Sequence, residues 1–260
     1  MNDIIKVKNT AYARYEEVLL QRDNLKKEAF LINRKYVAEF GDLIIQIFEK
    51  KIECIRKKKE IEFVQASINH GKTVDQEKLQ EFLRKEMEEF KHQLDIMVED
   101  TKNAKESEKI TEHALLKIKR IYHKLVKLIH PDINPLTEEN EELSDLWQRA
   151  QIAYNCNDLK GMEEADVLIR TLLERINVGV MEIEIPNIEE KIQEIENEIK
   201  NIRETDPYMY KYILEDKEMI DEKKQCLKEE YKSFEDYSLQ LDKVIEGLMS
   251  NGVRFTWRMN

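Results

Sequence analysis

The stretch YHKLVKLIHPDINP, residues 122–135, holds two of the chain's four prolines in a sequence that otherwise favours helix. Apolar residues recur through and before it at alternating spacings of three and four, which predicts a helix over 109–129. Pro131 ends that helix, because proline lacks a backbone N–H and disfavours helix at the residue before it. Thr137 has the side chain of an N-cap and is followed by acidic residues, which suit a helix start. The stretch therefore predicts two helices joined by a rigid turn.

The helix after this turn carries an apolar face that would pack against the first helix. That face consists of Leu143, Leu146, Trp147, Ala150 and Tyr154. Trp147 is the predicted core anchor of the pair, because its ring is the largest apolar surface that either helix offers. Asp158 is the predicted cap of a shorter helix that runs to about residue 176.

The composition of the 260-residue chain also favours long helices. It has 37% charged and 41% hydrophobic residues with only six glycines, a profile typical of coiled coils rather than sheets. The formal net charge of −11 argues against general nucleic-acid binding. Three cysteines without a C-x-x-C pair exclude a disulfide framework and a zinc ribbon. No apolar run reaches membrane-spanning length and the N-terminus lacks the apolar core of a signal peptide, so we expect a cytoplasmic protein without a membrane partner.

The N-terminal part of the chain predicts two paired helices. Residues 10–69 place apolar side chains along one face at the spacing of a coiled-coil seam. Gly71 suits the left-handed end of that helix, and Thr73 with Gln76 forms a capping box for the next. The next helix is predicted over 74–105, and the short connection favours an antiparallel hairpin.

The C-terminal part predicts a second hairpin with unequal arms. A regular isoleucine repeat indicates a helix over 188–202, and a longer apolar stripe indicates another over 213–250. The overhanging part of the longer arm would pack on the N-terminal helix. Residues 178–186 alternate apolar and polar side chains, which fits either a short strand or an extended crossover.

These patterns together predict an all-α fold of elongated antiparallel coiled-coil helices with a compact helical module inserted. The predicted segments are an N-terminal hairpin over 1–108, the module over 109–176, and a C-terminal hairpin with a tail over 177–260. A coiled coil of this kind also suits assembly into homo-oligomers.

A basic face distinguishes the predicted helix over 109–129 from the rest of this acidic chain. The residues on that face are Lys117, Lys119, Arg120, His123, Lys124 and Lys127. Such a face is a candidate docking surface for an acidic partner, whose approach it would steer. The alternative is an ordinary solvated helix face, partly neutralised by the acidic helix that follows.

The motif YHKLVKLIHPDINP, followed by LWQRAQIAYNCND at residues 146–158, resembles the J domain of the DnaJ-like Hsp70 co-chaperones. In that family a helix with a Tyr-basic-basic-Leu pattern ends in His-Pro-Asp, and the next helix ends in an Ala-Tyr pattern. The resemblance implies that this module contacts a DnaK-like Hsp70 and stimulates its ATP hydrolysis. The residues that it assigns to Hsp70 contact are Lys119, Tyr122, His123, Lys124, Lys127, His130, Pro131, Asp132 and Asn134.

Two features depart from the family pattern. The family's usual first helix, with its Tyr-x-x-Leu-Gly-Val signature, is absent before residue 109, and Ile133 stands where lysine or arginine is common. We expect the end of the 74–105 helix to take the place of the missing helix. No Gly/Phe-rich or Cys-rich region is present, so the chain resembles neither of the larger J-protein classes. The remainder of the chain is similar to bacterial coiled-coil proteins with an embedded, divergent J-like module.

The leading functional hypothesis is an Hsp70 co-chaperone without catalysis of its own, whose coiled coil recruits a client or oligomerises. Asp132 would offer its carboxylate to an arginine of the partner, and His130 would project beside it from the rigid turn. The rival is a coiled-coil scaffold whose J-like module has lost Hsp70 activity. No histidine pair has metal-ligand spacing and no motif indicates a nucleotide or other cofactor, so neither a metal nor a cofactor is expected.

Overall fold

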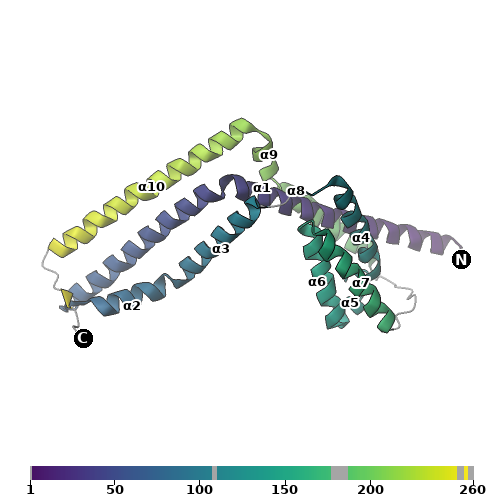
Figure 1. Cartoon of the computed structure of the whole chain (residues 1–260), viewed down its shortest axis with the longest axis horizontal. Helices are drawn as coiled ribbons and strands as arrows, with labels where there is room; N and C mark the ends of the chain where they lie inside the picture. Colours follow the sequence, from purple (N-terminus) through teal and green to yellow (C-terminus); the bar gives the residue numbers. More distant parts are fainter. Residues whose placement is uncertain (1, 107–109, 177–186, 251–254, 257–260) are drawn as a thin grey trace. The chain divides into compact units, whose positions relative to one another are not determined.

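A computed structural model of the chain describes residues 2–106, 110–176, 187–250 and 255–256 (Figure 1). The elements in chain order are α1 (Asn2–Asn69), β1 (Val74–Asp75), α2 (Gln76–Glu86), α3 (Glu88–Lys105), α4 (Glu112–Ile129), α5 (Leu136–Glu139), α6 (Glu141–Asn155), α7 (Leu159–Arg175), α8 (Ile188–Glu204), α9 (Tyr210–Glu215), α10 (Lys217–Ser250) and β2 (Phe255–Thr256). The all-α prediction is confirmed, and the β structure among these residues is a two-residue parallel pairing of β1 with β2. The alternating stretch 178–186 lies outside the described residues.

Helix α1 is shared by two compact units. One unit contains residues 1–33 and 108–211, and the other contains 34–107 and 212–260. This division differs from the three predicted segments, because the buried side chains of α1 extend from Tyr15 to Val64. A seam of that length offers separate surfaces to partners from distant parts of the chain.

The second half of α1 and the helices α2 and α3 form the predicted N-terminal hairpin. Gly71 has a φ of +66° and ends α1, as predicted from its freedom to adopt the left-handed conformation. Lys59 pairs with Glu86 of α2 at 3.0 Å, and Lys105 of α3 pairs with Asp42, so the helices run antiparallel.

The details of the second arm differ from the prediction. Its N-cap is Asp75, whose carboxylate accepts from the backbone N–H of Lys78 at 3.3 Å, rather than Thr73. The arm also breaks at the buried Met87, which separates α2 from α3. Asp75 caps because Val74, directly before it, pairs with β2 in extended conformation and is fully buried.

Helix α10 packs along the same half of α1, on the side away from α2 and α3 (Figure 1). Lys57 of α1 donates to Ser238 Oγ and Asp242 Oδ2 of α10, both at 2.7 Å. Near the other end of the contact, Lys224 pairs with Glu39. Residue numbers rise together along the two helices, so α10 runs parallel to α1.

The predicted C-terminal hairpin is therefore wrong. Helix α8 belongs to the unit with residues 1–33, whereas α10 belongs to the other unit. In its own unit α8 also runs parallel to α1, with Arg14 bonded to Glu196 at 2.8 Å and Lys26 to Glu198 at 3.4 Å. Each helix packs on a part of the long α1 seam instead of on the other.

Gly41 of α1 lies directly against Thr101 of α3, and replacing it with alanine is expected to destabilise that contact. An added Cβ would lie 2.6 Å from Oγ1 and 3.2 Å from Cβ of the buried Thr101, so rotation of the threonine does not clear the clash. We expect Gly41→Ala to lower the free energy of unfolding by about 1–3 kcal/mol, as overpacking does, although alanine favours helix. Urea denaturation followed by circular dichroism measures the loss.

Two further variants test this explanation. Gly247→Ala in α10 is the control, because no atom lies within 4 Å of the added Cβ, and it should be neutral or stabilising. Gly41→Ala combined with Thr101→Ala should recover part of the loss, because removing the threonine Oγ1 and Cγ2 makes room for the added methyl group. A Gly41→Ala variant as stable as Gly247→Ala would contradict the packing argument.

The unit that contains the His-Pro-Asp turn is built on three packed helices. Helix α6 packs against α7, and α4 packs against both. The largest fully buried side chains of these three helices are Ile118, Leu125, Ile129, Leu143, Met162 and Ile169. The first half of α1 contacts these helices through Asp23 and Asn24, so the expectation that the end of the 74–105 helix supports the module is wrong. That segment, α3, belongs to the other unit.

Candidate partner-binding site

The His-Pro-Asp turn is held by hydrogen bonds from both sides. The carbonyl oxygen of His130 accepts from the N–H groups of Ile133 at 2.8 Å and Asn134 at 2.7 Å. The side chain of Asn134 donates to the carbonyl of Leu128, and Thr137 Oγ1 donates to the carbonyl of Ile129, both at 2.8 Å. These bonds bind the turn to the last turn of α4, so its shape is fixed by the chain itself.

The side chains of Thr137 and Asn134 therefore stabilise the turn from within the chain. Thr137 is fully buried in the short helix α5, and the N-cap of α6 is Asn140, whose side chain accepts from the N–H of Leu143 at 3.0 Å. The predicted cap at Thr137 is wrong for this reason. Asn134, which the J-domain resemblance assigns to partner contact, is 6% exposed.

His130 turns inward rather than projecting from the turn. Its side chain is 4% exposed and meets the ring of Trp147 edge-on, with centroids 5.0 Å apart. The backbone nitrogen of Asp132 lies 3.1 Å from its Nδ1. Burial lowers the pKa of His130, against the opposing effect of the Asp23 and Asp132 carboxylates.

Asp132 is the exposed member of the turn. Its side chain is 39% exposed, while one carboxylate oxygen is bonded to Arg22 of α1 at 3.2 Å. Its backbone carbonyl accepts from the hydroxyl of Tyr15 at 3.4 Å. The prediction that Asp132 presents a carboxylate at the surface of a fixed turn agrees with this geometry.

The J-domain resemblance did not indicate Arg22 and Asp23 of α1, which contact the turn directly. Arg22 lies 3.1 Å from His130 Nε2 through its Nη2 atom, and both its Nε and Nη2 donate to Asp23 Oδ1 at 3.2 Å. The sequence does contain a feature that could have indicated Arg22. Arg22 occupies a position of the α1 seam between Val18 and Leu25 where the spacing calls for an apolar side chain.

Tyr122 is part of the interior that joins α1 to this unit. Its hydroxyl donates to Asp23 Oδ2 at 2.8 Å, and its ring stacks on Tyr154 with centroids 3.8 Å apart. Burial, followed by the charge of Asp23, raises the pKa of Tyr122. With 2% exposure, Tyr122 has no surface to offer a partner.

The basic face of α4 is exposed, as a docking surface requires. Lys119, Arg120 and Lys124 are exposed, whereas His123 is half-buried. Lys117 and Lys127 are exposed but paired, with Glu163 of α7 and with Glu16 of α1 respectively. The free part of the face therefore lies in the middle of α4.

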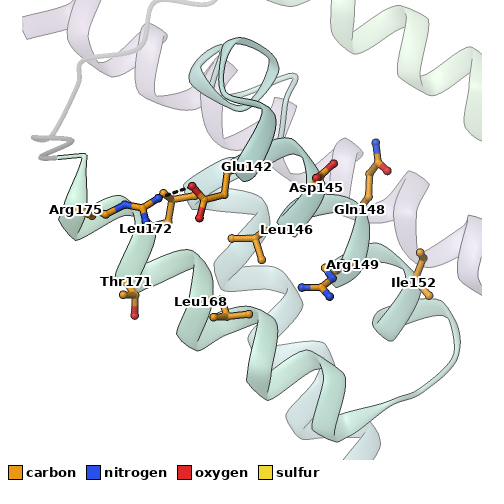
Figure 2. Close-up of a pocket in the computed structure, with 10 residues that line it drawn as sticks. All are labelled: Glu142, Asp145, Leu146, Gln148, Arg149, Ile152, Leu168, Thr171, Leu172 and Arg175. Carbon is orange, nitrogen blue, oxygen red and sulfur yellow. Dashed lines mark hydrogen bonds and ion pairs between the residues drawn. The ribbon is translucent and has the colours of Figure 1, made fainter.

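A groove between α6 and α7 is a separate surface feature of this unit (Figure 2). It has a volume of about 690 Å³, and Leu146, Leu168 and Leu172 are among its lining residues. An ion pair between Glu142 and Arg175 closes one end, as the dashed line in Figure 2 shows. The groove shares no residue with the His-Pro-Asp turn.

Comparisons with known proteins identify no relative, since no protein-family model, curated protein or solved structure matches the chain. Within the described residues, no group of three or more histidine, cysteine, aspartate or glutamate side chains is arranged to hold a metal ion. Over the same part of the chain, no helix is long and apolar enough to cross a membrane.

Proposed function

We propose that this chain is a J-domain-like co-chaperone that binds an Hsp70 through Asp132 and the exposed face of α4 and stimulates its ATP hydrolysis. The carrying observation is the joint exposure of the Asp132 carboxylate, in the turn that is hydrogen-bonded to the end of α4, and of Lys119, Arg120 and Lys124 of α4. A fixed carboxylate beside a basic face matches a partner that presents an arginine within an acidic surface. The chain itself then needs no catalytic group.

The remainder of the chain suits the recruiting role in this proposal. The long helices α1 and α10 would offer coiled-coil surfaces that bind a client protein or a second copy of the chain. Apolar side chains that include Leu239 and Val244 remain exposed along α10, at 56% and 47%. Such residues are available for contacts beyond those of one chain.

The steady-state ATPase rate of an Hsp70 from the same organism tests the proposal. The intact protein should raise that rate several-fold, and Asp132→Asn should remove the rise, because the amide is nearly isosteric but carries no charge for an arginine. Circular dichroism of Asp132→Asn confirms that its helices are intact. The absence of any stimulation by the intact protein would refute the co-chaperone function.

The rival proposal, a scaffold whose J-like module does not act on Hsp70, also has an observation in its favour. His130 is buried and Asp132 already has an arginine partner within the chain. In that case Asp132→Asn would change the stability of the unit but no Hsp70 rate.

A further inference from the structure

The contact between Arg22 and the His-Pro-Asp turn has the features of an occupied binding site. The guanidinium touches Asp132 Oδ2 through Nη1 and His130 Nε2 through Nη2, at 3.2 and 3.1 Å. Only 11% of the Arg22 side chain is exposed. A surface arginine that meets a partner by chance would not be enclosed in this way.

The surroundings of this guanidinium carry an excess of negative charge. Asp23 and Asp132 each lie 3.2 Å from Arg22, and Glu198 of α8 lies 3.9 Å away. Lys26 pairs with Glu198 at 3.4 Å, whereas Asp23 and Asp132 both pair with Arg22. The contacts use different nitrogens of the planar group, which a compact ammonium does not offer.

We propose that the pocket formed by Asp23, His130 and Asp132 is a guanidinium-binding site that Arg22 fills within the chain and that an arginine of the Hsp70 fills in its place. The inference rests on the proposed function for the identity of the partner, but not for the existence of the site. It makes Arg22 an internal competitor for Asp132, which lowers the apparent affinity for Hsp70 by the fraction of time that the site is filled.

The geometry explains how such an exchange takes place. Arg22 meets Asp132 through one nitrogen only, and the carboxylate is 39% exposed. An arginine that arrives from solvent can form the stronger two-bond contact with that open carboxylate. Helix α1 itself stays in place, because the buried Leu19 and Leu25 anchor it to the unit, so only the Arg22 side chain moves.

A second charge on α1 supports the same inference independently. Glu16, six positions before Arg22, pairs with Lys127 of the basic face at 2.6 Å, and its own side chain is 18% exposed. Helix α1 thus presents an arginine to the carboxylate and a carboxylate to the basic face. These are the two charges that the proposed partner surface must bring.

Chemical rescue tests the site without any Hsp70. In Arg22→Ala, ethylguanidinium at millimolar concentration should raise the thermal unfolding midpoint, whereas ethylammonium at the same concentration should not. The unaltered protein, whose site is filled, should show no rise, and Asp132→Asn in the Arg22→Ala background should reduce it. Equal effects of both cations, or an equal rise in the unaltered protein, would overturn the inference. If Arg22→Ala is partly unfolded, recovery of its helical signal by ethylguanidinium alone is the same test.

The ATPase assay tests the competition. Arg22→Ala, and Arg22→Gln as a second variant closer in size, should lower the concentration needed for half-maximal Hsp70 stimulation several-fold. Arg14→Gln, two turns before Arg22 on α1 and bonded to Glu196 rather than to the turn, is the control and should leave that concentration unchanged. A folded Arg22 variant that needs the same or a higher concentration refutes the competition. If no protein stimulates Hsp70, the proposed function fails, and the rescue experiment still decides whether the guanidinium site exists.

Discussion

Replacing Trp147 with alanine is expected to lower the free energy of unfolding of the unit that contains α4, α6 and α7 by about 3–5 kcal/mol, the usual cost of removing a large buried aromatic. The indole is 4% exposed and lies between the ring of Tyr122, at 5.6 Å between centroids, and the edge of His130. Its loss would leave a cavity beneath the His-Pro-Asp turn. The turn should therefore lose its fixed shape together with the core.

Hydrogen exchange resolved along the chain is the suitable measurement, because the chain contains two units and a single unfolding midpoint would combine them. In Trp147→Ala, backbone amides of α4, α6 and α7 should exchange faster, while those of α10 keep their protection. Ile152→Ala is the matched control, since Ile152 lies on the same helix with 63% exposure and should change stability by less than about 0.5 kcal/mol. Unchanged protection in Trp147→Ala would show that the indole is not the anchor of this core.

Local features of the fold were predictable from the sequence. The end of α4 before Pro131, the left-handed Gly71 and the Asp158 cap, which accepts from the N–H of Gly161 at 3.0 Å, each depend on a few neighbouring residues. Where two capping residues lay close together, the sequence did not distinguish them. Asp75 caps instead of Thr73 because the extended pairing of Val74 delays the helix.

Pairing between distant helices was not predictable in the same way. The apolar residues of α8 and α10 have the same heptad-like spacing as those of α1. That spacing alone does not determine whether α8 and α10 pack on each other or on α1. The sequence of α1 nevertheless held the clue to the site. A charged pair, Arg22 and Asp23, interrupts its seam, and such an interruption is stable only where another part of the chain supplies polar partners.

The same reasoning explains which predicted site residues lie at the surface. Lysines on a helix face remain exposed because their ammonium groups need water, as Lys119 and Lys124 do. The polar atoms of Tyr122, His130 and Asn134 are buried because each finds a partner within the chain. A motif alone does not separate these two groups, since both occur within the sixteen residues from Lys119 to Asn134.

Replacing Asp23 with alanine is the other change with a large expected effect. Asp23 is 6% exposed and accepts hydrogen bonds from Arg22 and from the hydroxyl of Tyr122. Its removal takes away the carboxylate that accepts from the buried Tyr122 hydroxyl and leaves a mostly buried guanidinium with one carboxylate fewer. We expect the free energy of unfolding to fall by about 3 kcal/mol, because breaking a buried charge pair from one side leaves the remaining charge less well compensated.

A double-mutant cycle separates the two bonds that Asp23 accepts. Tyr122→Phe alone should cost about 1 kcal/mol, the net value of one hydrogen bond, because Asp23 keeps Arg22. Asp23→Ala combined with Tyr122→Phe should cost less than the sum of the single changes, since the first change has already removed the bond between the carboxylate and the hydroxyl. The control is Glu196→Ala in α8, which breaks an exposed ion pair with Arg14 of α1. It should leave the unfolding midpoint nearly unchanged. Strict additivity within the cycle would mean that the Tyr122 hydroxyl and the Asp23 carboxylate contribute separately, and that the bond between them does not hold α1 to α4.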